Sequence, residues 1–254
     1  MAAVAPPVVS AQTLPPSGEH LPVGSETRAS SDGHESPEIE SASFEIAQHG
    51  HEVGTASFNF TATPDGYDST SLVKVSMEGL DFALSKAEEL SPGNQFVHVQ
   101  LSATVNGEAV NVIAKPDAAQ LLVNISAGGK STTTRLTAHK GAVFLPDFDP
   151  GALETLLEIA LAQNNRDVWA VLPIQAGSVE PVELATYADQ EGTLDGKKIA
   201  VHHMVATIAA TKTELFSGPA NQLLQAELPQ EGFALIRKGF VLKPAAKPDA
   251  PRTE

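Results

Sequence analysis

The sequence contains no cysteine among its 254 residues, and it has only one tryptophan and two tyrosines. Without cysteine the chain forms no disulfide bond, thiolate metal site or cysteine nucleophile. It also lacks any apolar run close to the roughly 20 residues that a membrane-spanning helix needs, so we expect no transmembrane segment. Basic side chains are few: 16 lysines and arginines stand against 31 acidic residues, for a formal charge of −15. This charge repels nucleic acids and anionic membranes, and we expect no nucleic-acid partner.

Both ends of the chain have the composition of disordered segments. Residues 12–41 and 243–254 are rich in proline and polar residues, and they offer too little apolar surface to offset the entropy of ordering. We therefore expect a disordered leader over 1–41, one folded domain over 42–242 and a disordered tail over 243–254. Within the leader, "AAVAPPVVSAQ" resembles the end of a secretory signal peptide, since Val9 and Ala11 fit the small-x-small cleavage rule. This predicts a secreted or periplasmic bacterial protein; the alternative is a plain Ala/Pro-rich disordered tail.

The folded region consists of short alternating segments separated by Gly, Pro, Asn and Asp, a pattern typical of β structure. One segment differs, because Asp149 and Pro150 form a helix start signal and apolar residues follow at helical spacing. These residues are Leu153, Leu156, Leu157, Ala160 and Leu161. We expect a mainly β (α+β) fold: a large antiparallel curved sheet or half-barrel of about ten to twelve strands, packed on one amphipathic helix near 150–164.

Two-residue turn signals predict the register of several hairpins. Asn106-Gly107 is typical of a type I′ turn and sets Val105 opposite Glu108. The same register places three apolar pairs on one face: Ala103 with Val110, Leu101 with Val112, and Val99 with Ala114. A turn at His49-Gly50 sets Ile46 against Val53, and a further turn is expected at 229–232.

The run "AGGKSTTT" contains the Gly-Lys-Ser of a phosphate-binding loop, but its context predicts a hairpin. A phosphate loop has a glycine five residues before Gly129, where this chain has Asn124, and it continues into a helix. Here three threonines follow, and β-branched residues favour strands. A turn at Gly128-Gly129 instead produces a consistent register that pairs Ile125 with Thr132, Val123 with Thr134, Leu121 with Leu136 and Ala119 with Ala138. We therefore expect no nucleotide site.

Candidates for metal binding or catalysis are scattered. His202 and His203 are adjacent in a predicted strand, where neighbouring side chains point to opposite faces, so they cannot chelate one ion together. Neither an H-E-x-x-H nor a G-x-S-x-G motif occurs. Asp147 and Asp149 offer calcium ligands or a carboxylate dyad, but helix capping already accounts for Asp149. The sequence predicts no metal site, no cofactor and no catalytic residue.

Several segments in order resemble a known class of proteins. "FEIAQHGHEVGTASFNFT", with Gly50 and Gly54 in its hairpin, is followed by "GAVFLPDFDPGALETLL", "VWAVLPIQAG" and "LLQAELPQEGFALIRKGF". Over roughly residues 44–242 they resemble uncharacterised bacterial envelope proteins of domain-of-unknown-function type, although Gly218 is displaced from the position of the matching glycine. The resemblance implies a secreted or periplasmic sheet curled about a helix, similar to lipoprotein carriers that hold acyl chains. It implies no catalytic residue.

Three functions remain open at this point. The first is non-enzymatic binding of an apolar, lipid-like ligand in the curved sheet, with five expected ligand-binding residues: Leu153, Leu156, Leu157, Leu161 and Trp169. The second is a structural or assembly role in the bacterial envelope, with a protein partner at a sheet edge. The third is a hydrolase with a dispersed site. A cavity beside Leu156 and Trp169 favours the first function, and a packed core favours the second.

Overall fold

The computed structural model describes residues 39–173 and 177–243, and strands dominate them. Seventeen strands form one curved, unclosed mixed sheet, accompanied in the described residues by a single helix, α1. The predicted mainly β fold with one helix is confirmed. The strand number exceeds the prediction because many strands are short: five of them, β9, β10, β12, β16 and β17, have only three to five residues. Such short segments carry too few alternating positions to be recognised in a sequence.

The described strands lie between Ile39 and Leu242, and the sequence predicts a folded domain over 42–242. The first described strand begins at Ile39, three residues before the predicted start at 42, and the last one ends at Leu242. The predicted leader up to residue 38, with its signal-like motif, and the predicted tail from residue 244 lie outside the described residues.

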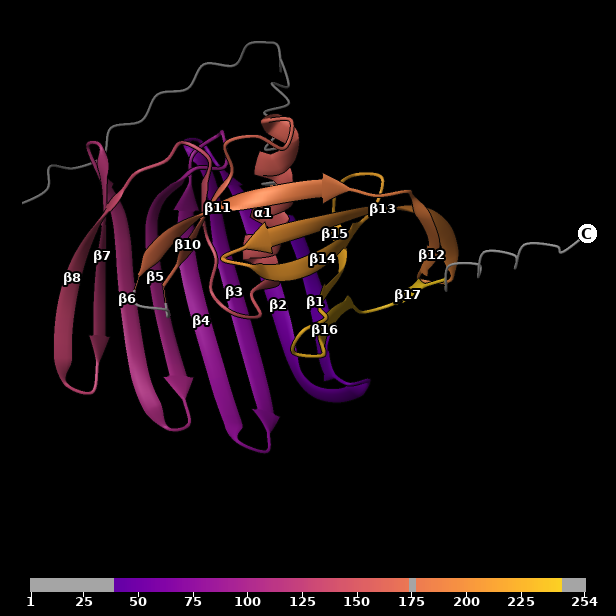
Figure 1. Ribbon diagram of the computed structural model, residues 1–254, viewed down its shortest axis with the longest axis horizontal. Coiled ribbons are helices and arrows are strands. Elements are labelled where there is room, and N and C mark those ends of the chain that lie inside the picture. Colours follow the sequence, from indigo (N-terminus) through magenta and orange to yellow (C-terminus); the bar gives the residue numbers. More distant parts are fainter. Residues whose placement is uncertain (1–38, 174–176, 244–254) are drawn as a thin grey trace, which may run out of the picture. The chain divides into compact units, whose positions relative to one another are not determined.

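The first half of the domain is an antiparallel meander in which each strand pairs with the next. Figure 1 shows these long strands side by side, in indigo to magenta. Their bounds are β1 Ile39–Gln48, β2 His51–Thr63, β3 Gly66–Met77, β4 Leu80–Leu90, β5 Phe96–Val105, β6 Glu108–Asp117, β7 Gln120–Ala127 and β8 Lys130–Thr137.

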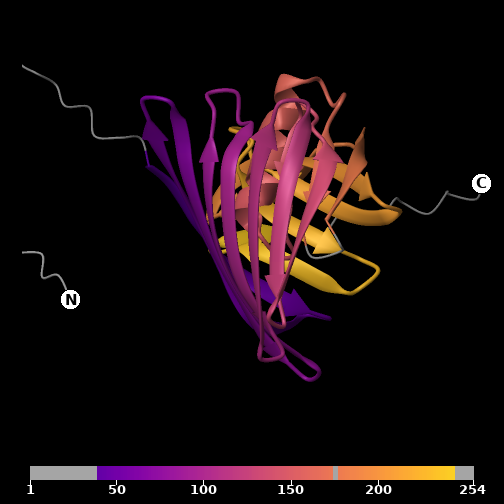
Figure 2. The same ribbon diagram turned by 90° about the vertical axis from the view of Figure 1, so that its left-hand side faces the viewer.

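The second half continues the same sheet, because β16 pairs with the free edge of β1. From β16 the order runs through β15, β14, β13 and β11 to β10 and β9, and the β9–β10 pair is parallel. These strands lie on one side of the meander and cross its strands (Figures 1 and 2). Their bounds are β9 Ala142–Phe144, β10 Trp169–Leu172, β11 Ser178–Thr186, β12 Gln190–Leu194, β13 Lys197–Ile208, β14 Thr211–Ser217, β15 Leu223–Leu228, β16 Phe233–Arg237 and β17 Phe240–Leu242.

Helix α1 spans Pro150–Ala162 and contacts β2 and β3 of the meander as well as β9 and β15 of the second half. It begins where the sequence predicts, since Asp149 Oδ1 accepts hydrogen bonds from Gly151 N at 2.9 Å and Ala152 N at 3.2 Å. Ten of its thirteen residues are buried, so it is enclosed on nearly every side. Leu161 is the exception within the predicted apolar face: it is 58% exposed, because the helix leaves the core in its last turn.

One continuous core fills the space between the meander, the helix and the second half. Phe44, Leu101, Phe144 and Leu156 are among its buried members. A smaller cluster beneath β12 and β17 comprises Val201, Phe216, Leu224 and Phe240. No helix in residues 39–173 or 177–243 is long and apolar enough to cross a membrane.

The predicted hairpin registers hold at two of three turns: the pairs about Asn106-Gly107 and Gly128-Gly129 form as expected. The further turn expected at 229–232 is also present, and Leu228 pairs with Phe233 across it. The register about His49-Gly50 is wrong by one residue, since Ile46 lies opposite Gly54 rather than Val53. A β-bulge after Ile46 inserts the extra residue. A side chain at position 54 would collide with the carbonyl of Lys74 on β3, so this position requires glycine.

The Gly-Lys-Ser run is a hairpin tip that joins β7 to β8, with Gly128 and Gly129 both at positive φ. Lys130 is exposed beside this turn. Replacing Lys130 by alanine is expected to change the free energy of unfolding by no more than about 0.5 kcal/mol, the usual range for an exposed side chain. Urea denaturation measures this change. Saturable ATP binding that disappears in Lys130→Ala would contradict the turn assignment.

Candidate functional site

A cavity of about 340 Å³ opens at the N-terminal end of α1. Three connections meet there: the loop between β9 and α1, the β13–β14 hairpin and the β15–β16 turn. We call it the helix-end cavity. Its wall is mainly apolar and consists of Leu145, Pro146, Asp147, Phe148, Asp149, Leu153, Leu172, Ile208, Ala209, Thr211, Thr213, Leu228, Glu231, Phe233 and Leu235.

Phe148 forms part of this wall through an uncommon backbone conformation. Its φ of 58° lies in the left-handed region, which bulky side chains seldom adopt. Its ring packs edge-to-face against Phe233, with centroids 4.9 Å apart, and against Phe82 at 6.0 Å. These aromatic contacts hold the loop before α1 against the β15–β16 turn.

The charges at the helix-end cavity are all acidic. Asp147 and Glu231 are exposed at its mouth, whereas Asp149 is buried as the helix cap. Among the described residues that line the cavity, none is a lysine, arginine or histidine. The cavity therefore combines an apolar interior with an anionic entrance.

Of the five residues predicted to bind ligand, Leu153 alone lines this cavity. Leu156 and Leu157 are buried in the core and border none of the described cavities, while Leu161 faces solvent. Trp169 is half-buried and stacks on His139, with ring centroids 3.6 Å apart. None of the described cavities borders Leu156 or Trp169, and the described hollow that Leu153 lines lies at the N-terminal end of the helix.

The sequence does not identify the hairpin tips around the cavity as part of a site. Ile208 precedes an Ala-Ala turn in which both alanines have positive φ, and Phe233 follows the turn at 229–232. Alternation predicts that both of these apolar side chains face inward. It does not predict that two separate hairpins meet beside the same helix end, since that depends on long-range sheet order.

A second hollow, of about 260 Å³, lies along the side of α1 and brings carboxylates together. Glu40, Glu154 and Glu158 line it with Phe60, Tyr67, Leu90, Asn94 and Thr155. Burial raises the pKa of Glu154 to about 8. The Leu223 N–H donates a hydrogen bond of 2.7 Å to the Glu154 carboxylate, and this bond acts to lower the pKa. Burial also raises the pKa of Glu158, and Glu40 adds to the shift. In this acidic cleft three titratable groups converge in a hollow, an arrangement that hydrolase chemistry requires.

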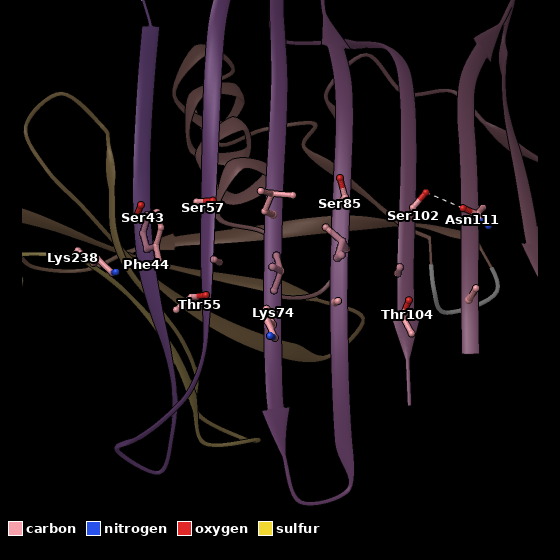
Figure 3. A pocket seen from close by; sticks show the side chains of 17 residues that line it. Ser43, Phe44, Thr55, Ser57, Lys74, Ser85, Ser102, Thr104, Asn111 and Lys238 are labelled. Carbon is pink, nitrogen blue, oxygen red and sulfur yellow. Dashed lines mark hydrogen bonds between the residues drawn. The ribbon is translucent and has the colours of Figure 1, made fainter. Parts of the chain in front are cut away.

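The largest of the described hollows is a shallow trough of about 680 Å³ across the outer face of β1–β6 (Figure 3). One cross-strand row runs along it, in which Ser57, Leu72, Ser85 and Ser102 lie opposite one another. Leu72 is 60% exposed within this row. Lys74 and Lys238 line the trough, and no carboxylate does so among the described residues. In a chain of charge −15 this is an unusual cationic, hydroxyl-rich surface.

A buried ion triad lies in the core beneath the start of α1. Lys86 Nζ is 2.8 Å from Glu88 Oε2 and 2.8 Å from Asp149 Oδ2, and all three side chains are 0–1% exposed. Burial alone would lower the pKa of Lys86, but the two carboxylates raise it above its ordinary value. Burial raises the pKa of Glu88, and the neighbouring ammonium group of Lys86 offsets part of this increase. The triad thus consists of one ammonium group and two carboxyl groups shielded from water.

The two adjacent histidines take opposite faces of β13, as expected. His202 is exposed, with Nδ1 3.0 Å from Asp189. His203 stacks between Tyr187 and Phe216, at centroid distances of 5.0 and 4.7 Å, and its Nε2 lies 3.3 Å from Glu214. Within the described residues no group of three His, Asp or Glu side chains is placed to hold a metal ion.

Comparisons with known proteins identify no relative. No protein-family model matches the chain, and neither a curated protein nor a solved structure is significantly similar to it.

Proposed function

We propose that the protein is a non-enzymatic binder of a small apolar ligand, which it holds in the helix-end cavity. The observation that carries this proposal is an apolar hollow of about 340 Å³, near the lower end of the roughly 300–1,000 Å³ typical of small-molecule sites. Leu153, Ile208 and Phe233 supply apolar walls from three different elements.

The charges at the entrance favour a neutral or cationic ligand. Asp147 and Glu231 would repel a fatty acid or an anionic phospholipid, and no basic residue lines the cavity to pair with one. The volume suits a compact molecule better than a long acyl chain. Among lipid-like ligands we therefore favour neutral, compact ones.

We propose that this binder is a bacterial protein that is either periplasmic or secreted. Two features of the sequence support this part of the proposal: the signal-like motif around Val9 and Ala11, and the resemblance of residues 44–242 to envelope proteins. The absence of cysteine is compatible with that location.

Filling the cavity is expected to weaken binding. Thr213 on β14 lines the cavity and is half-buried, so Thr213→Trp places a large ring in it with little disturbance of the core. With the neutral apolar dye N-phenyl-1-naphthylamine, fluorescence titration should show saturable binding to the unaltered protein and at least about tenfold weaker binding to the variant.

Thr207→Trp is the matched control, because Thr207 is a half-buried threonine on the neighbouring strand that does not line the cavity. It should leave the dye affinity unchanged. Equal weakening in both variants would place the dye elsewhere. Native mass spectrometry of the purified protein, followed by organic extraction, would identify a ligand retained from the host.

The second candidate is a structural or assembly role, in which an acidic partner docks in the trough. Lys74, Lys238 and the exposed Leu72 favour it, since the trough bears positive charge on an acidic protein. Absence of saturable dye binding would leave this role as the better proposal. A hydrolase would have to use the acidic cleft, where Glu154 already accepts the N–H of Leu223.

A further inference from the structure

The buried ion triad places the amine of Lys86 beside the carboxyl group of Asp149, with both side chains buried. Lys86 and Glu88 are two residues apart on β4, so both point inward, where they lie opposite Ser71 and Ser69 on β3. Asp149 reaches the same amine from the start of α1. Among the described residues, Lys86 is the one cation within ion-pair distance of either carboxylate.

Burying such a triad costs free energy of folding. Each buried charge loses its hydration, and one ammonium group cannot neutralise two carboxylates. The hydroxyls of Ser69 and Ser71 are also buried nearby, and neither has a hydrogen-bond partner in the part of the chain that the structure describes. A reaction that removes the charges of Lys86 and Asp149 together would relieve this cost.

We propose that Lys86 and Asp149 condense to an intramolecular isopeptide bond, with Glu88 as the proton-transfer group. The amide would tie β4 to the first turn of α1. It would supply a covalent cross-link in a chain that has no cysteine for disulfides. This inference is independent of the ligand proposal.

The two oxygens of Asp149 already occupy distinct environments that suit this reaction. Oδ1 accepts hydrogen bonds from the N–H groups of Gly151 and Ala152 at the helix N-terminus, while Oδ2 faces the amine of Lys86 at 2.8 Å. Negative charge that develops on Oδ1 during attack is therefore stabilised by preorganised donors and by the helix dipole. The same oxygen still caps the helix afterwards, now as an amide carbonyl.

The reaction balances without any added reagent. The Lys86 ammonium transfers a proton to Asp149 Oδ2, and the freed nitrogen lone pair attacks Cγ to form a tetrahedral intermediate. Glu88, in its protonated form, donates a proton to Oδ2 and takes one from the nitrogen, so it ends unchanged. The Cγ–Oδ2 bond breaks, one water leaves, and the Nζ–Cγ amide remains. Fixed proximity of the two groups makes the step effectively unimolecular.

Intact-mass spectrometry of the purified full chain tests the proposal. The expected mass is one water below that of the sequence, with a tryptic branched peptide that joins the segments of Lys86 and Asp149. Loss of water without that branched peptide would indicate a succinimide, for example at Asp195-Gly196, and would overturn the proposal. A mass equal to that of the uncondensed sequence, with Lys86 open to acetylation after denaturation, would overturn it as well.

Two variants separate the roles of the residues. Asp149→Ser keeps a helix-capping oxygen but has no acyl group, so it should retain the full uncondensed mass. Glu88→Gln keeps the shape of the side chain without its acid–base function, and it should slow condensation by about a hundredfold or more. Condensation in Glu88→Gln at the unaltered rate would overturn the proton-transfer role of Glu88.

Discussion

Replacing Leu156 by alanine is expected to lower the free energy of unfolding by about 2–5 kcal/mol, the usual cost of truncating a fully buried leucine. Leu156 is 1% exposed in the middle of α1, and none of the described cavities borders it. Its removal therefore leaves a void enclosed by both halves of the sheet. Urea or guanidinium denaturation at equilibrium measures the change, provided that the transition is two-state.

Leu161→Ala on the same helix is the matched control. Leu161 is 58% exposed, so its truncation should change stability by no more than about 0.5 kcal/mol. A penalty near 1 kcal/mol for Leu156→Ala would contradict the closed core, because a side chain that lines a pre-existing cavity has fewer contacts to lose. Such a result would restore the lipid channel along the helix that the sequence suggests.

Local chemistry explains why much of the fold could be predicted. Asn106-Gly107 and Gly128-Gly129 supply the positive φ angles of tight hairpin turns, and alternation on either side then determines the register. Asp149 and Pro150 specify the start of the helix in the same way. Each of these features depends on only a few neighbouring residues.

The features that could not be predicted depend on distant parts of the chain. The bulge after Ile46 is a one-residue insertion that alternation does not reveal, and it shifts Gly54 into contact with β3. Leu161 fits the helical period, but the core ends before it. The helix-end cavity exists because the β13–β14 hairpin and the β15–β16 turn meet beside α1, which follows from β16 returning to β1.

The buried ion triad could be predicted from the sequence only in part. On β4 the period-two pattern puts Lys86 and Glu88 on the same inward face as Leu84 and Leu90. Alternation therefore predicts that both side chains are buried, whereas their charge favours exposure, because charged residues are seldom fully buried. The third member, Asp149, is distant in sequence, and its role as the helix cap gives no sign of its contact with Lys86.

Stability is expected to fall as pH rises because of Glu154. Burial raises its pKa to about 8 from an ordinary value of 4.5, so between these pH values the folded chain holds a proton that the unfolded chain has released. The stabilising contribution of the protonated carboxyl is complete below pH 4.5 and is lost by about pH 8. Linkage gives a loss on the order of 5 kcal/mol across this window. Denaturation curves at a series of pH values measure it.

Glu154→Gln should flatten this dependence and make the protein more stable than the unaltered chain above pH 8. The amide oxygen can still accept the Leu223 N–H, while the charge that burial penalises is gone. Glu183→Gln removes an exposed carboxylate on β11 and should leave the pH dependence as it is. Burial also raises the pKa of Glu88 and of Glu158, so the difference between the unaltered protein and Glu154→Gln isolates the contribution of Glu154. An identical slope in both proteins would show that Glu154 is already ionised at low pH, which would place water or a cation in the acidic cleft beside it.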